Sequence, residues 1–156
     1  MRRSDREIKD SERINEIIQS CDCCRLGFID INSTYIVPLN FGFTVIDNKR
    51  ILYFHGAKEG KKIELIKANA NVGFELDTNH GINRGETACS HSYGFLSIIG
   101  KGTIGVVDDE EEKKEALRVI MKHYSGKDDW VFDDAAVNRI AILKLAVTEL
   151  SCKEHE

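Results

Sequence analysis

The chain has 156 residues, of which 42% are hydrophobic and 31% charged, a balance typical of one globular domain that needs no disulfide or metal to fold. Its formal net charge of -4 does not favour a nucleic-acid or anionic-membrane partner. No apolar run approaches the roughly 20 residues of a membrane span. Residues 1–10 are charged, without the apolar core of a secretory signal, and the five cysteines suit a reducing compartment. We therefore expect a single cytoplasmic domain over residues 1–156.

The first part of the chain predicts one helix followed by three strands. Ser4 and Glu7 have the spacing of a capping box, and an apolar stripe at helical spacing follows and predicts a helix that ends near Ser20. The stripe consists of Ile14, Ile17, Ile18 and Cys21. A short apolar run predicts a strand over 26–31, alternating apolar residues predict one over 35–45, and a third is expected over 51–56, with turns at 32–33 and 47–49. These three strands are expected to form an antiparallel meander.

The second part predicts two further helices and three further strands. Helical periodicity covers 59–70 and 109–124, with one more helical turn at 133–138, and strands are expected over 71–77, 93–107 and 139–150. The polar stretch 78–91 is expected to be a long functional loop. Gly100 and Gly102 fit a coiled strand at a barrel corner. Because regular crossover helices are missing between the strands, the pattern favours a mainly antiparallel β-barrel with helices over a doubly wound parallel sheet.

Two adjacent lysines open the helix predicted from residue 59. Lys61 and Lys62 would lie in its first turn, where the helix dipole makes each cation unfavourable by roughly 0.3–1 kcal/mol. A bound phosphate would offset this cost and accept hydrogen bonds from the free N–H groups. We therefore interpret the segment as a phosphate site. The alternative is that both lysines are solvated and balanced by Glu59 and Glu64.

Pro38 is the only proline of the chain. Proline cannot donate a hydrogen bond to a strand ladder, so it is expected at a sheet edge or bulge. Backbone groups left unpaired there could bind a planar heterocycle. Alternatively, Pro38 only protects an edge strand from aggregation.

Three segments in register carry a family resemblance. They read YIVPLNFG at 35–42, LYFHGAKEGKK at 52–62 and SYGFLSIIGKG at 92–102. Together with the opening MRRSDREI, they resemble the nitroimidazole-resistance (Nim) branch of the pyridoxamine 5′-phosphate oxidase-like family, over nearly the whole chain. The resemblance implies an antiparallel split β-barrel of the α+β class that binds FMN and forms a homodimer, with two flavin sites at the dimer interface.

The resemblance also implies a set of flavin-binding residues. It aligns the isoalloxazine with Val37, Pro38, Leu39 and Asn40. It assigns the ribityl phosphate or the reactive face to His55, Lys61 and Lys62. A segment of its own or the partner subunit would approach the flavin through Cys89, Ser92 and Tyr93. His55 is the candidate catalytic residue, because imidazole can deliver a proton near neutral pH; alternatively it only donates a structural hydrogen bond.

The resemblance suggests an oxidoreductase that reduces a small molecule such as a nitro compound. A vitamin B6 oxidase is not expected, because the chain ends in CKEHE and we find no basic cluster there for a substrate phosphate. The alternative function is a non-enzymatic flavin- or haem-binding module, with an axial ligand from His55, His80, His91 or His123. Cys21 and Cys24 have the spacing of a metal pair, but isolated cysteines are more often buried hydrophobes, so no metal site is expected.

Overall fold

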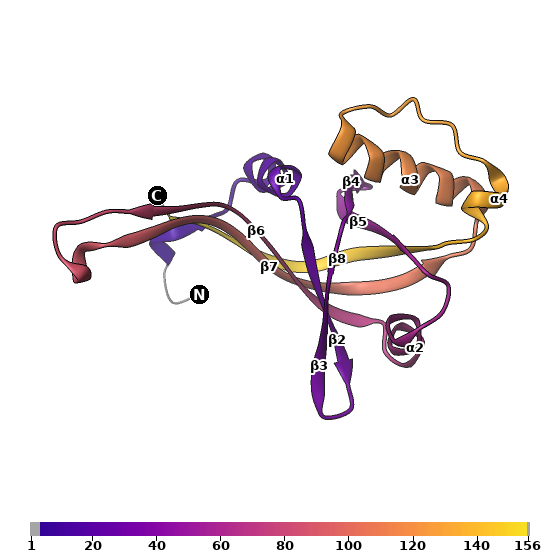
Figure 1. Ribbon diagram of the computed structural model, residues 1–156, viewed down its shortest axis with the longest axis horizontal. Helices are drawn as coiled ribbons and strands as arrows, with labels where there is room; N and C mark the ends of the chain where they lie inside the picture. The colour runs from indigo at the N-terminus through magenta and orange to yellow at the C-terminus, as the bar shows by residue number, and fades with distance from the viewer. Residues whose placement is uncertain (1–3, 156) are drawn as a thin grey trace.

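One antiparallel sheet of eight strands carries the fold of the computed structural model, which describes residues 4–155 (Figure 1). The strands follow the order β3-β2-β6-β7-β8-β5-β4, and β1 pairs with β8. Their bounds are β1 Glu7–Ile8, β2 Cys24–Asp30, β3 Ser33–Leu39, β4 Gly42–Ile46, β5 Lys49–Gly56, β6 Asn71–Asn83, β7 Ser92–Val107 and β8 Ala141–His155. This antiparallel sheet with flanking helices is the predicted split barrel of the α+β class.

The helices cover the two faces of the curled sheet. Their bounds are α1 Ser11–Ser20, α2 Lys61–Ala68, α3 Glu110–Ser125 and α4 Asp134–Val137, with short 3-10 turns at Ser4–Arg6 and Ala88–Ser90. Alternate residues of β5 point to opposite faces. Leu52 and Phe54 belong to an inner core that α1 and α2 complete. Ile51 and Tyr53 belong to an outer core beneath α3.

The N-terminal helix begins later than predicted. Its N-cap is Asp10, whose Oδ1 accepts a hydrogen bond from the Arg13 N–H at 2.7 Å. The predicted capping box at Ser4 is wrong, because Ser4–Arg6 forms a 3-10 turn and Glu7–Ile8 pairs with the end of β8. The predicted apolar stripe is confirmed as buried, and it consists of Ile14, Ile17, Ile18 and Cys21.

The predicted meander is wrong, because the strand expected over 35–45 is two strands. β3 pairs with β2, and β4 pairs with β5, so the two halves lie at opposite ends of the strand order. The break falls at Phe41, which is fully buried and whose N–H donates to the Tyr124 hydroxyl at 3.1 Å. Gly42 then lies directly on α3, where a Cβ would be 2.5 Å from the Ile120 nitrogen. Close packing on α3 therefore redirects the chain.

The predicted loop over 78–91 is shorter than expected, because residues 78–83 are strand and only 84–91 lie outside the strands. β6 continues to Asn83 and β7 begins at Ser92, so the two form a hairpin arm that extends away from the body (Figure 1). The expected barrel corner is confirmed by a register shift between Lys101 and Gly102. A Cβ at Gly102 would collide with the Ala146 carbonyl oxygen, so this close approach requires glycine.

Candidate functional site

The start of α2 leaves backbone donors free. Gly60 precedes the helix with a φ of 113° and offers no side chain for a cap. Its carbonyl oxygen accepts hydrogen bonds from the N–H groups of Ile63 and Glu64. Within residues 4–155, the N–H groups of Lys61 and Lys62 have no such partner. Two donors at the positive end of the helix dipole are therefore available to an anion.

Lys61 connects this helix start to the β2–β3 hairpin. Its Nζ lies 2.5 Å from Oδ2 of Asp30 and 4.9 Å from the centre of the Tyr35 ring. The hydrogen bond to Asp30 raises the pKa of Lys61. Both partners come from the hairpin, so Lys61 fixes α2 beside the edge strand β3.

Lys62 has no counterion in the described part of the chain, although its side chain is half-buried. A Cβ at Gly56 would lie 2.7 Å from its Nζ, so the ammonium packs against the glycine at the end of β5. Burial lowers the pKa of Lys62. Lys62 forms no ion pair with Glu59 or Glu64, the two glutamates that would balance it in the alternative interpretation. An uncompensated, partly desolvated cation of this kind favours binding of an anion.

The segment predicted to lie along a flavin ring is an edge strand. Pro38 stands in β3, the end strand of the sheet path, which confirms the edge position predicted for proline. Val37 and Leu39 face the inner core, whereas the side chains of Pro38 and Asn40 are exposed. Tyr35 shares the inward face with Val37, and Lys61 lies over its ring. The fold thus brings β3 and the start of α2 side by side.

His55 is exposed on the opposite face of β5 from Gly56. In a strand, consecutive residues point to opposite faces. Because Gly56 faces the Lys62 ammonium, the His55 side chain lies on the other face of β5. Its strand partner there is Ile142 of the outer core. One chain does not bring the His55 ring to Lys62, and the catalytic role of His55 stays a prediction.

The third predicted segment lies near the tip of the hairpin arm, far from α2 (Figure 1). Cys89 is exposed in the 3-10 turn at the tip. The Ser92 hydroxyl accepts a hydrogen bond from the Asn83 amide at 3.1 Å. The exposed Tyr93 ring stacks against His80, with 6.1 Å between ring centres. Within one chain, these residues and Lys62 do not form a common site.

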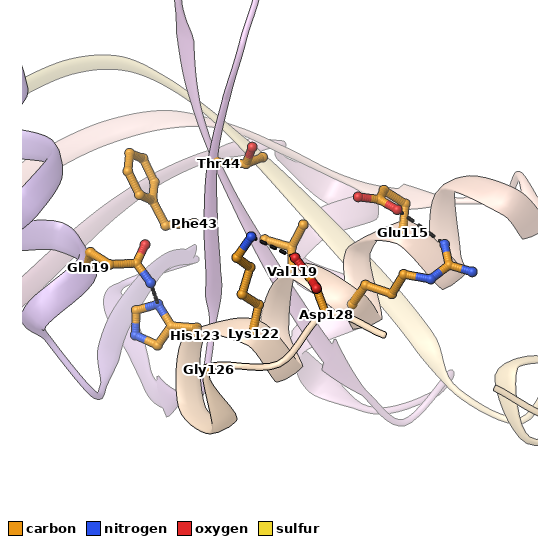
Figure 2. A pocket seen from close by; sticks show the side chains of 10 residues that line it. Gln19, Phe43, Thr44, Glu115, Val119, Lys122, His123, Gly126 and Asp128 are labelled. Carbon is orange, nitrogen blue, oxygen red and sulfur yellow. Dashed lines mark hydrogen bonds and ion pairs between the residues drawn. The ribbon is translucent and has the colours of Figure 1, made fainter. Parts of the chain in front are cut away.

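A hollow of about 710 Å³ lies between α1, β4 and the C-terminal half of α3 (Figure 2). Its charged side chains pair with one another: Arg118 with Glu115 at 3.2 Å, and Lys122 with Asp128 at 2.7 Å. None of the residues predicted for the flavin site lines it. The hollow thus offers no uncompensated charge comparable with Lys62.

Sequence reasoning identified the lysine pair but missed what surrounds it. The Asp30 carboxylate is the counterion of Lys61, whereas Lys62 packs against Gly56 and has no counterion among the described residues. The only signal for Gly56 was its place at the end of an apolar strand run, two residues after Phe54.

The cysteines show no metal site. Across residues 4–155, no group of three or more His, Cys, Asp or Glu side chains is arranged to hold a metal. All five cysteines are free, and Cys21, Cys24 and Cys152 are buried. Burial raises the pKa of Cys21 to about 12 and that of Cys152 to about 11.

Among the helices of residues 4–155, none combines the length and the apolar character that a membrane span requires.

The antiparallel split barrel, with a basic helix start beside an edge strand, defines this protein as a split-barrel protein of the α+β class. Residues 10–154 match the sequence profile of the pyridoxamine 5′-phosphate oxidase family, and the chain belongs to this family.

Solved structures agree with this assignment. A candidate 5-nitroimidazole antibiotic resistance protein from Bacteroides thetaiotaomicron is 35% identical, with a TM-score of 0.82 over 95% of this chain and 86% of that chain. The flavocytochrome Anf3 from Azotobacter vinelandii is 18% identical, with a TM-score of 0.80 over 100% and 72%. An FAD and haem binding protein from Mycobacterium smegmatis is 14% identical, with a TM-score of 0.81 over 97% and 74%. The last two show the fold alone. No curated protein matches the chain.

Proposed function

We propose that this protein binds FMN, with the flavin phosphate at the start of α2 and the isoalloxazine along Val37, Pro38, Leu39 and Asn40 of the β3 edge. The observation that carries the proposal is Lys62, a half-buried ammonium without a counterion among the described residues. The residues present fit a flavin phosphate, because Lys62 adds its charge to two free backbone N–H groups. Two proteins of this fold that are described as binding FAD support a flavin ligand in general.

The proposed activity is reduction of a small molecule, with a nitro compound as the first candidate. Bound FMN would supply the electron transfer, and the protein would orient the ring and hold protons. The 35% identity to a candidate 5-nitroimidazole resistance protein supports this substrate class. His55 is proposed to deliver a proton, and its exposed imidazole is accessible for that role.

We further propose a homodimer in which a second copy completes the site. The face of the sheet opposite the inner core carries three isoleucines that are more than half exposed: Ile29, Ile36 and Ile99. A second copy would cover this apolar surface. Its arm could then bring Cys89, Ser92 and Tyr93 to the flavin, which one chain cannot do. Sedimentation of the purified protein at the mass of one chain would contradict this arrangement.

FMN titration of flavin-free protein tests the cofactor proposal. We expect quenching of flavin fluorescence with saturation, and Lys62→Gln should weaken the affinity about 10- to 100-fold, because a charge-assisted hydrogen bond is lost. Lys67→Gln, an exposed lysine later in the same helix, is the matched control and should bind like the wild type. Absence of FMN binding by the wild type, or equal affinity in the Lys62 variant, would refute the site. The visible spectrum of the purified protein separately distinguishes flavin from haem.

The nitro-reduction proposal has its own test. FMN-loaded protein is reduced with a stoichiometric amount of dithionite under anaerobic conditions, and a 5-nitroimidazole is then added. We expect the flavin absorbance to return as the nitro group is reduced, and the amine to form with continued supply of reductant. A flavin that stays reduced would remove the nitroreductase assignment and leave FMN binding untouched.

A further inference from the structure

A second hollow, of about 520 Å³, lies at one end of the barrel between α2 and the start of α3. Its volume falls in the range of small-molecule sites, about 300–1,000 Å³. An apolar floor is formed by Ile63, Ile66, Val106, Ile140 and Ala141. Val106 is 39% exposed at the end of β7, so apolar surface is open to a ligand there.

The rim of this hollow is positively charged. Lys58, Lys67 and Lys113 line it together with a single carboxylate, Asp108. None of the three lysines forms an ion pair within the part of the chain that the structure describes, and Lys113 is half-buried. A protein with a formal net charge of -4 thus has a local excess of positive charge above an apolar floor.

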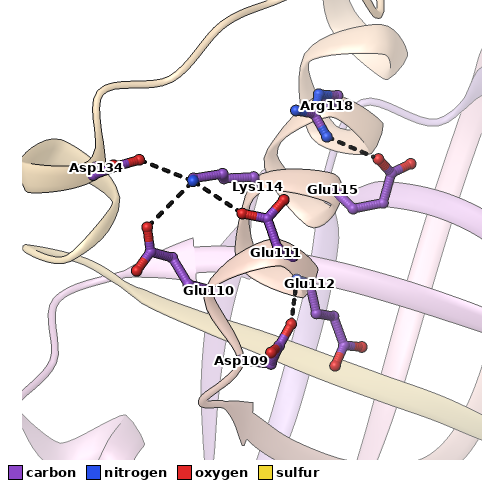
Figure 3. Close-up of polar contacts among 8 residues, drawn as sticks. All are labelled: Asp109, Glu110, Glu111, Glu112, Lys114, Glu115, Arg118 and Asp134. Carbon is purple, nitrogen blue, oxygen red and sulfur yellow. Dashed lines mark hydrogen bonds and ion pairs between the residues drawn. The ribbon is translucent and has the colours of Figure 1, made fainter.

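The acidic run beside the hollow does not neutralise this charge, because its members have other partners (Figure 3). Asp109 accepts a hydrogen bond from the Glu112 N–H at 2.8 Å and caps α3. Lys114 forms ion pairs with Glu110 and Glu111 at 3.2 and 3.1 Å. The Glu112 carboxylate binds Lys144 at 2.6 Å. Lys113 is therefore left for a ligand.

We propose that this hollow binds a small amphipathic anion, an apolar body that carries one carboxylate or phosphate group. The apolar body would displace water from the isoleucine and valine floor, and the anionic group would lie among the three rim lysines. The hollow shares no lining residue with the proposed flavin residues, although Ala141 of its floor is the strand partner of Gly56, on which Lys62 packs. It does not depend on the proposed flavin function.

Octanoate is a suitable probe, because it joins an apolar chain to one carboxylate. We expect octanoate to shift the methyl resonances of Ile63, Ile66 and Val106 in carbon-13 methyl NMR spectra of the full chain, and to leave that of the distant Ile31 unchanged. The double substitution Lys67→Gln, Lys113→Gln should weaken octanoate binding roughly tenfold through loss of two ion pairs. Lys49→Gln, an exposed lysine in β5, is the control and should bind octanoate like the wild type.

Four outcomes would overturn the proposal. Octanol binding as tightly as octanoate would show that the rim charges are not used. Inorganic phosphate binding as tightly would show that the apolar floor is not used. Equal octanoate affinity in the wild type and the double variant would remove the lysines from the site. Displacement of octanoate by FMN would show that both ligands share one site, whereas unchanged octanoate affinity in FMN-saturated protein supports two.

Discussion

The first turns of α2 and α3 are opposite solutions to the same problem, the free N–H groups and positive dipole at a helix start. α3 begins with the cap Asp109 and three glutamates, and Lys114 and Lys144 balance those glutamates. α2 begins with Gly60, which provides no cap, and with two lysines. The start of α3 is satisfied within the protein, whereas the start of α2 is left with an unpaired cation and free donors.

This difference separates scaffold from binding site. Charges and caps that complement the dipole stabilise a helix, so the start of α3 contributes to folding. An arrangement that opposes the dipole costs stability, which a bound anion can restore. Changes at the start of α3 should therefore lower stability without altering flavin affinity, whereas removal of the Lys62 charge should weaken flavin binding without lowering stability.

The largest effect is expected where α3 packs on the sheet. A Cβ at Gly42 would lie 2.5 Å from the Ile120 nitrogen and 2.7 Å from the Val119 carbonyl carbon. Because backbone cannot move as easily as a side chain, Gly42→Ala should lower the free energy of unfolding by about 3 kcal/mol. Urea denaturation measures this loss. Gly105→Ala is the control, because no atom lies within 4 Å of its Cβ position. Equal stability of the two variants would contradict close packing of α3 on β4.

Two lysine substitutions should have opposite effects on the flavin-free protein. Burial lowers the pKa of Lys62, so the folded state disfavours the charged form, and Lys62→Met should leave the midpoint of thermal unfolding unchanged or raise it. Hydrogen bonds to Asp134, Glu111 and Glu110 raise the pKa of Lys114. Lys114→Met should therefore lower the midpoint. A lower midpoint for the Lys62 variant would indicate a structural role for that lysine. It would contradict the contrast between the starts of α2 and α3.

A smaller effect is expected at the cap of α3. Asp109→Ala removes the acceptor for the Glu112 N–H and should lower the free energy of unfolding by about 1 kcal/mol. The neighbouring Asp108→Ala leaves the cap in place and should change it by less than about 0.5 kcal/mol. Urea denaturation compares the two variants, and FMN affinity should be the same in both. A loss of FMN affinity in the Asp109 variant would mean that the two helix starts are not independent.

Local periodicity predicted the elements that pack on a core, and it failed where neither face of an element is buried. The stripe of α1, the helix α3 and the long strand β7 each bury one face. The arm residues 78–83 are mostly polar and exposed, so their strand pairing left no hydrophobic alternation to recognise. The break between β3 and β4 also had no local signal, because alternation continues from Tyr35 to Val45 and the cause is the distant α3.

The candidate site divides in the same way. Adjacent lysines at a predicted helix start are visible in the sequence, and the edge position of Pro38 follows from its missing N–H. Which lysine is unpaired could not be predicted, because Asp30 comes from a hairpin 31 positions earlier in the chain and Gly56 from the end of another strand. Long-range contacts between strands and helices bring these residues together, and local sequence patterns do not predict such contacts.

An effect of the same size, which shrinks as the pH is lowered, is expected at the other end of α3, where His123 couples the helix to α1. Its Nε2 lies 2.7 Å from the Cys21 carbonyl oxygen, and its Nδ1 lies 3.1 Å from the Gln19 amide nitrogen. Burial lowers the pKa of His123 below 6.5, against smaller opposing contributions from the Cys21 carbonyl and Asp22.

Between the folded and unfolded pKa values of His123, the unfolded state binds more protons, so stability should fall as the pH is lowered through this range. His123→Gln cannot titrate there. At pH 7 the variant should be less stable by about 1 kcal/mol, because it loses a hydrogen bond, and this difference should shrink towards pH 5. Urea denaturation at both pH values measures it, and the other titrating groups cancel between the two proteins. A difference that stays constant with pH would show that His123 keeps its ordinary pKa and that burial at the junction of α3 with α1 does not affect its titration.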